Sequence, residues 1–212
     1  MNSPHRDTPV LQRFRLDGRS ALVTGAGRGI GRAIAIGLAE AGADVCVTSR
    51  SAAELASACE QITALGRRAT AVTADLLDPL ALAAIVPAMV AELGSVDILV
   101  NNAGQAGLKD PFADVPMSDW EARLRLLLTV HVALTQQAVR WMTGAGRPGA
   151  IVNVSSIYGL AGSPGGERNS APSRTTPRPS TGWWASPGRW RSSSRRRTSA
   201  STRCALAGST PR

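Results

Sequence analysis

Cysteine is scarce in this chain, and the few cysteines lie far apart. Only Cys46, Cys59 and Cys204 occur among 212 residues. They are too few and too scattered to predict a disulfide framework or a zinc site. Cys46 falls within an apolar run typical of a strand, so we expect it to be a small buried side chain.

Long apolar runs are also missing. The longest, residues 80–93, contains Pro87 and is too short to span a bilayer. Residues 1–17 are polar and hold no apolar run of the secretory kind. These absences predict a cytoplasmic protein with no membrane partner.

Acidic residues are absent from the last part of the chain. The formal net charge is +9, but ten arginines and no acid lie from Arg168 to Arg212, so that segment carries +10 and the rest carries −1. The basic charge therefore belongs to a tail and does not characterise the folded part. We predict a lead-in at residues 1–17, one folded domain at 18–166 and a basic, disordered tail at 167–212.

Strand-like and helix-like segments alternate between residues 20 and 154. This alternation predicts a parallel sheet with right-handed crossovers, and hence an α/β fold. The expected strands are residues 20–24, 44–48, 69–73, 96–100 and 150–154. The expected helices are residues 29–41, residues 52–65, one opened by Asp78-Pro79 and ended by Gly94, and a long one capped by Ser118-Asp119 that runs to Met142.

A glycine-rich turn follows the first expected strand. It reads Thr24-Gly25-Ala26-Gly27-Arg28-Gly29-Ile30-Gly31 and leads straight into a helical pattern. Glycines at such a turn let backbone N–H groups approach a pyrophosphate at the helix start, although glycines also make ordinary tight turns. The spacing resembles the Thr-Gly-x-x-x-Gly-Ile-Gly turn of the short-chain dehydrogenase/reductase family.

Two further motifs match that family at the ends of later strands. Asn101-Asn102-Ala103-Gly104 resembles the family's Asn-Asn-Ala-Gly motif, and residues 151–159 resemble its fifth strand and catalytic serine. The pattern serine-x-x-glycine selects Ser156 rather than Ser155 as that serine, whose hydroxyl would bond the substrate carbonyl. The resemblance covers about residues 17–166. It implies a Rossmann-like, doubly wound sheet in the order 3-2-1-4-5, truncated before the last two strands.

The resemblance also implies which residues contact a nicotinamide cofactor. An acid at the end of the second strand would bond the ribose 2′-hydroxyl of NAD, whereas an arginine accommodates the 2′-phosphate of NADP. Ser49 and Arg50 stand there, so we predict NADP over NAD, unless Arg50 is merely a solvated loop residue. Asp75 falls where the family has an acid facing adenine, although a lone acid there also suits a cap or loop. The predicted cofactor-binding residues are Gly25, Arg28, Gly29, Ile30, Gly31, Ser49, Arg50, Asp75, Leu76, Asn101, Ala103 and Gly104.

The catalytic pattern of the family is incomplete in this chain. The family uses a tyrosine and, four residues later, a lysine that lowers the pKa of the tyrosine. This chain has one tyrosine, Tyr158, and one lysine, Lys109, which cannot form that pair. In the long helix, Leu127 falls where the family usually has an asparagine.

The genetic code permits an origin for the tail in a shifted reading frame. Tryptophan has a single codon, so Trp183-Trp184 fixes the bases TGGTGG, and reading each codon from the last base of the one before turns Trp184 into valine. In that frame the codon spanning residues 175 and 176 permits tyrosine. The codon four positions later, spanning residues 179 and 180, permits lysine.

A second stretch agrees with the same shifted frame. Residues 198–208 permit Ile-Arg-Val-Asn-Ala-Leu-x-Pro-Gly-Trp, which is similar to the family's sixth strand and the loop after it. We infer a frameshift, in the gene or in its sequencing, between about Arg168 and Thr175. Loss of the active-site helix, which forms much of the homo-oligomer interface in the family, would leave apolar surface uncovered.

Two functions remain open from the sequence. The first is a short-chain dehydrogenase/reductase that transfers hydride between NADP(H) and an alcohol or carbonyl substrate, with little turnover as written. The second is a non-catalytic nucleotide-binding protein whose basic tail binds nucleic acid, with Trp183, Trp184 and Trp190 as stacking platforms. Nucleic acid is the less expected partner.

Overall fold

A computed structural model describes residues 9–105 and 114–156 of the chain. The tail at 167–212, Tyr158, Lys109 and the segment with the inferred frameshift lie outside the described residues. Within the described part, no helix has the length and apolar character needed to cross a membrane.

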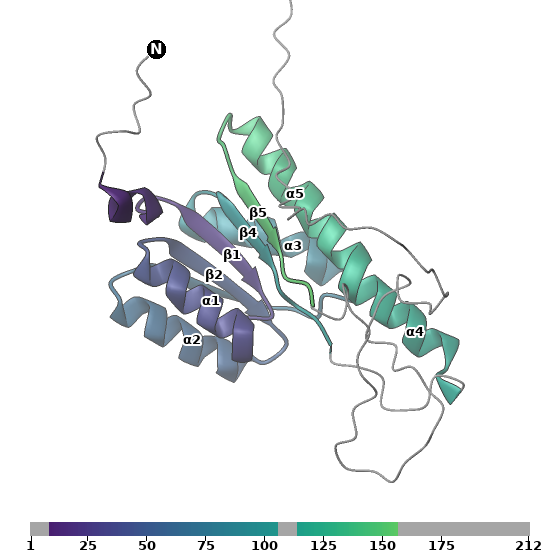
Figure 1. Ribbon diagram of the computed structural model, residues 1–212. Coiled ribbons are helices and arrows are strands. Elements are labelled where there is room, and N and C mark those ends of the chain that lie inside the picture. The colour runs from purple at the N-terminus through teal and green to yellow at the C-terminus, as the bar shows by residue number, and fades with distance from the viewer. Residues whose placement is uncertain (1–8, 106–113, 157–212) are drawn as a thin grey trace, which may run out of the picture.

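A five-stranded parallel sheet forms the centre of the molecule (Figure 1). Its order is β3-β2-β1-β4-β5, which confirms the predicted fold class and strand order. In the register, Leu22 of β1 lies opposite Cys46 of β2 on one side and Leu99 of β4 on the other. The strands are β1 (Ser20–Thr24), β2 (Asp44–Ser49), β3 (Ala69–Thr73), β4 (Ile98–Asn101) and β5 (Ala150–Asn153).

Helices cover both faces of the sheet, α1 and α2 on one face and α3 and α5 on the other (Figure 1). Alternate residues of β1 divide between the two cores, since successive strand side chains point to opposite faces. Ala21 and Val23 pack with α1 and α2, whereas Leu22 packs with α3 and α5. The helices are η1 (Val10–Phe14), α1 (Gly29–Glu40), α2 (Ala52–Ala64), α3 (Pro79–Leu93), α4 (Met117–Leu124), η3 (Arg125–Thr129) and α5 (Val130–Gly144).

Cys46 lies in the core on β2 and is fully buried, as predicted. Burial raises the pKa of its thiol to about 12, so it stays protonated and behaves as an apolar side chain. The two apolar side chains near the end of the lead-in differ in burial. Leu16 packs against the core, but Phe14 is 70% exposed.

The ends of α3 follow the sequence signals closely. The Asp78 carboxylate accepts a hydrogen bond from the Leu80 N–H at 2.9 Å, and Pro79 stands in the first turn. Gly94 ends the helix in the left-handed conformation, with φ of 83°.

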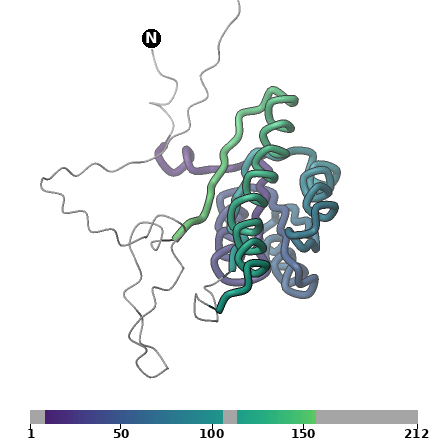
Figure 2. Tube along the Cα trace, turned by 90° about the vertical axis from the view of Figure 1, so that its right-hand side faces the viewer, coloured from purple at the N-terminus to yellow at the C-terminus, as the bar shows by residue number. Residues whose placement is uncertain are grey.

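The long helix departs from its prediction in two ways. Its N-cap is Pro116, so Ser118 and Asp119 lie inside the first turn rather than capping it. Its middle, η3 at Arg125–Thr129, is π-helical rather than α-helical. Figure 2 shows that the chain coils on without a break from α4 into α5. The helix is therefore continuous but locally widened.

The amino ends of β1, β4 and β5 meet at one buried carboxylate, Asp97, which is 2% exposed. One carboxylate oxygen accepts hydrogen bonds from the Ser20 N–H at 2.9 Å and the Ser95 hydroxyl at 2.8 Å. The other accepts from Arg147 at 2.8 and 3.0 Å and from Arg19 at 3.3 Å. Burial alone would raise the pKa of Asp97, but these hydrogen bonds outweigh it and hold the pKa below its ordinary value.

Candidate functional site

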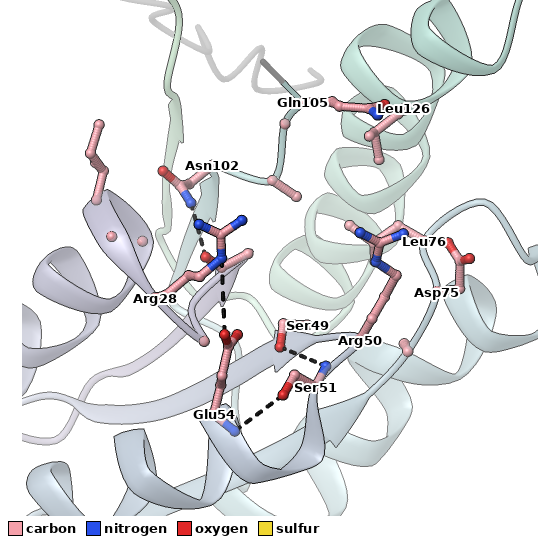
Figure 3. A pocket seen from close by; sticks show the side chains of 18 of the residues that line it. Arg28, Ser49, Arg50, Ser51, Glu54, Asp75, Leu76, Asn102, Gln105 and Leu126 are labelled. Carbon is pink, nitrogen blue, oxygen red and sulfur yellow. Dashed lines mark hydrogen bonds and ion pairs between the residues drawn. The ribbon is translucent and has the colours of Figure 1, made fainter. Parts of the chain in front are cut away.

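A cavity of about 550 Å³ opens at the carboxyl edge of the sheet (Figure 3). This edge is where ligands of open parallel sheets usually bind. The lining comes from the turn after β1, the starts of α1 and α2, the end of β2, the loop after β3 and the segment after β4, with one residue from η3. The lining residues are Gly25, Gly27, Arg28, Gly29, Ile30, Gly31, Ser49, Arg50, Ser51, Glu54, Ala74, Asp75, Leu76, Leu77, Asn102, Ala103, Gly104, Gln105 and Leu126.

Two glycines of the turn, Gly25 and Gly31, are packed so closely that a side chain has no room there. Gly25 has φ of 65°, and a Cβ there would lie 2.9 Å from the Cα of Ala103. A Cβ on Gly31 would collide with the side-chain nitrogen of Asn102 and the carbonyl oxygen of Gly25. The glycines therefore let α1 start directly against the turn and the end of β4.

The start of α1 faces the cavity without a protein cap. Its N-cap Arg28 makes no side-chain capping bond, and the first turn holds no acid. Backbone N–H groups at such a helix start lack partners within the helix and favour a negative charge. Arg28, Gly29, Ile30 and Gly31 all line the cavity, so this end of α1 suits an anionic group such as a pyrophosphate.

The segment after β4 is tied to β1 and to α5. The Thr24 hydroxyl oxygen accepts hydrogen bonds from the backbone N–H of Asn102 at 3.0 Å and of Ala103 at 2.9 Å. The side-chain amide of Asn102 donates to the carbonyl oxygens of Thr24 at 2.9 Å and Gly25 at 3.3 Å. The Ala103 carbonyl oxygen lies 3.0 Å from His131 Nε2. These bonds fix one wall of the cavity.

Asn101 is placed differently from its prediction as a cofactor contact. It is fully buried and does not line the cavity. Its side-chain amide donates to the Asn153 side chain of β5 at 2.9 Å and to the Thr135 hydroxyl of α5 at 3.2 Å. Asn101 therefore joins β4, β5 and α5, and its neighbour Asn102 faces the cavity instead.

The end of β2 brings together the residues predicted to meet the adenosine ribose. Ser49, Arg50 and Arg28 all line the cavity, and the Ala26 N–H donates to the Thr48 carbonyl oxygen at 3.2 Å, which holds the glycine turn against β2. Glu54 of α2, which the sequence reading did not single out, lies beside them, 3.9 Å from the Arg28 guanidinium.

The loop after β3 places Asp75 and Leu76 in the lining, as the resemblance implied. The Asp75 carboxylate accepts a hydrogen bond from the Leu77 N–H at 2.9 Å, so it also shapes its own loop. Both interpretations of this acid are thus compatible with its position. Leu76 is nearly buried and belongs to the core as well as to the wall.

The catalytic end of the site is only partly described. Ser156 lies three residues beyond β5, is exposed, and is not among the residues that line the cavity. Leu127 lies in η3, where a Cβ on Gly104 would meet its side chain at 3.4 Å. The resemblance assigns the asparagine of the family to this position, where the structure has an apolar side chain.

Comparisons with known proteins identify the family of this chain. The chain belongs to the short-chain dehydrogenase family, whose model, described as short chain dehydrogenase, matches residues 19–171. It is 36% identical to the 2-dehydro-3-deoxy-D-gluconate 5-dehydrogenase of Escherichia coli K12 over 72% of this chain and 59% of that protein.

Two similar solved structures contain nicotinamide cofactors. One is 7α-hydroxysteroid dehydrogenase with NADH and 7-oxo glycochenodeoxycholic acid, with 36% identity, a TM-score of 0.68, and 73% and 59% of the two chains covered. The other is a metagenomic short-chain oxidoreductase with NADP, with 37% identity, a TM-score of 0.62, and coverages of 66% and 63%. The chain spans less than two thirds of the length of these relatives.

Replacing Gly31 with alanine is expected to destabilise the fold by about 1–3 kcal/mol, because the new methyl group forces α1 away from the turn. Gly37→Ala is the matched control in the same helix. A Cβ there meets no atom within 4 Å, and alanine is expected to raise the stability by up to about 1 kcal/mol. Urea unfolding of both variants measures the difference, and equal effects would contradict the close packing.

Proposed function

We propose that this chain is an oxidoreductase built to transfer hydride between NADP(H) and an alcohol or carbonyl substrate. The observation that carries the proposal is the cavity at the carboxyl edge of the sheet. It joins an uncapped helix start, an arginine at the end of β2 and the segment after β4. Named relatives in the family are dehydrogenases, which supports the reaction class.

The residues around the cavity fit a dinucleotide. The start of α1 would hold the pyrophosphate, Ser49 and Arg50 the adenosine ribose, Asp75 and Leu76 the adenine, and residues 102–104 the nicotinamide ribose. The bound cofactor would supply the hydride chemistry at its nicotinamide. Arg50 is the argument for NADP, because a guanidinium pairs with a 2′-phosphate.

Proton transfer is the step that this sequence does not support. Ser156 is proposed to hydrogen-bond the substrate oxygen. The 212 residues contain no tyrosine followed four residues later by lysine. The match to the family ends at residue 171, inside the interval inferred for the frameshift, which supports that inference. We therefore propose little or no turnover for the chain as written.

Equilibrium binding of NADPH and NADH, followed by nucleotide fluorescence, tests the cofactor proposal. NADPH is expected to bind at least about fivefold more tightly, because the charge-assisted bonds to Arg50 form only with the 2′-phosphate. Arg50→Ala should abolish or reverse the difference, whereas Arg140→Ala, at an exposed arginine of α5, should preserve it. Equal affinities in the wild type would overturn the NADP preference, and no binding of either would overturn the cofactor site.

A further inference from the structure

Glu54 lies in the first turn of α2, in a sequence pattern typical of a helix cap. Ser51-Ala52-Ala53-Glu54 has the spacing of a capping box, in which the serine oxygen and the glutamate carboxylate each accept a backbone N–H. The first of these hydrogen bonds forms, since the Ser51 hydroxyl oxygen accepts from the Glu54 N–H at 3.3 Å. The second does not, because the Ser51 N–H donates to the Ser49 hydroxyl oxygen at 3.3 Å. The Glu54 carboxylate therefore does not cap the helix.

This carboxylate lies in the cavity where the glycine turn meets the end of β2 (Figure 3). A Cβ built on Gly27 would lie 2.6 Å from one Glu54 carboxylate oxygen and 2.9 Å from the Ser49 hydroxyl oxygen. The two oxygens therefore both lie close to Gly27 of the turn. Ser49 ends β2, and the end of this strand is where dinucleotide-binding sheets contact the adenosine ribose.

Stability does not explain this placement. The only ion pair that the described residues give Glu54 is with Arg28, at 3.9 Å, and the two side chains are 41% and 86% exposed. Exposed ion pairs of this kind contribute little to folding. A carboxylate held there does, however, distinguish a ribose hydroxyl, which can donate a hydrogen bond to it, from a phosphate, which it repels.

We propose that Glu54 supplies, from the start of α2, the ribose-recognising carboxylate that the sequence lacks at the end of β2. It accepts a hydrogen bond from the 2′-hydroxyl of NAD and opposes the 2′-phosphate of NADP. Its pairing with Arg28 also weakens the contribution of that arginine to phosphate binding. Glu54 therefore limits the preference set by Arg50, and this inference rests on the proposed cofactor site.

Binding of NADP⁺ and NAD⁺ to Glu54→Gln, measured by calorimetry, tests the proposal without requiring turnover. The variant keeps the size of the side chain and a residue suited to the capping position. NADP⁺ is expected to bind about three- to tenfold more tightly, because a like charge is removed, and NAD⁺ more weakly, because a neutral amide is the poorer acceptor. Glu60→Gln, an exposed glutamate of the same helix, makes the same charge change away from the cavity and should alter neither affinity.

The outcomes separate this inference from the function on which it rests. If Glu54→Gln binds both nucleotides as the wild type does, the inference is overturned and the cofactor site stands. If Glu60→Gln gains as much affinity for NADP⁺ as Glu54→Gln does, the effect comes from net charge, and the inference is likewise overturned. If the wild type binds neither nucleotide, both proposals fail together. Two smaller probes test whether the ribose end alone is responsible. Glu54→Gln should then bind adenosine 2′,5′-bisphosphate more tightly and 5′-AMP more weakly than the wild type does.

Discussion

Asp97→Ala is expected to lower the free energy of unfolding by about 3–5 kcal/mol, the usual cost of breaking a buried charged network. The change leaves the buried Ser20 N–H without its acceptor and leaves the Ser95 hydroxyl only the Ser20 hydroxyl oxygen, 3.1 Å away. It also removes the hydrogen bonds by which Arg147, just before β5, is joined to the amino ends of β1 and β4. The side chains of Arg147 and Arg19 are 40% and 42% exposed, so water can hydrate them once the carboxylate is removed. We therefore expect a loss in the lower part of that range.

Urea unfolding at neutral pH measures this loss. Glu92→Ala removes an exposed carboxylate near the same edge and is expected to change stability by no more than about 0.5 kcal/mol. A loss at Asp97 as small as that at Glu92 would show that the buried network does not hold the strand ends together.

The pH dependence of the wild type provides an independent check on Asp97. Its folded pKa lies below an unfolded value of about 3.9, so its contribution is complete above that pH and is lost as the pH falls through the folded pKa. Asp97→Asn cannot titrate and should flatten the stability profile below about pH 4 relative to the wild type. An unchanged profile would contradict the assignment.

The fold was predictable because each central strand is apolar and ends at a clear turn signal. The bounds of β1 and β3 match their predictions, and α1, α2 and α3 agree within about one residue. β4 begins later than expected because Asp97, within the apolar run from residue 96 to 100, serves as a hydrogen-bond acceptor before strand pairing starts. An apolar pattern does not reveal where pairing begins.

The cofactor-binding part of the site was predictable from motifs, but two details required coordinates. Asn101 and Asn102 are adjacent, and successive strand residues face opposite sides, so the motif alone does not say which one reaches the cavity. Glu54 reads as a capping residue, and only the bond from the Ser51 N–H to Ser49 shows that its carboxylate is free for another role. The π-helical turn η3 leaves no sequence signal that we could identify.

The apolar edge beside the site bears on the missing active-site helix. β5 is the last strand of the described sheet, and Val152 on it is 48% exposed. On the opposite face of the sheet, Leu128 of η3 is 62% exposed and Val132 of α5 is 49% exposed. This exposed apolar surface of the helix is what we expect if a further helix belongs against it. It therefore favours a tail whose natural reading frame encodes family-like structure.

Restoring the shifted frame is expected to raise turnover by at least about 10²–10⁴-fold, the usual contribution of a positioned proton donor. In the shifted frame the genetic code permits a tyrosine and, four residues later, a lysine whose charge would lower the tyrosine pKa. Sequencing the coding DNA across Glu167 to Thr181 comes first, since a missing or extra base there would identify the repaired chain as the natural one. Oxidation of NADPH by a panel of ketones and aldehydes then compares the two chains.

A matched control separates proton transfer from folding in that comparison. A repaired chain whose new tyrosine is replaced by phenylalanine should bind NADPH as the repaired chain does and lose its turnover. If the phenylalanine variant stays active, the tyrosine is not the proton donor, and the resemblance fails at its catalytic step. If the chain as written turns over as fast as the repaired one, it already holds a complete proton path, and Ser156 becomes the first residue to test.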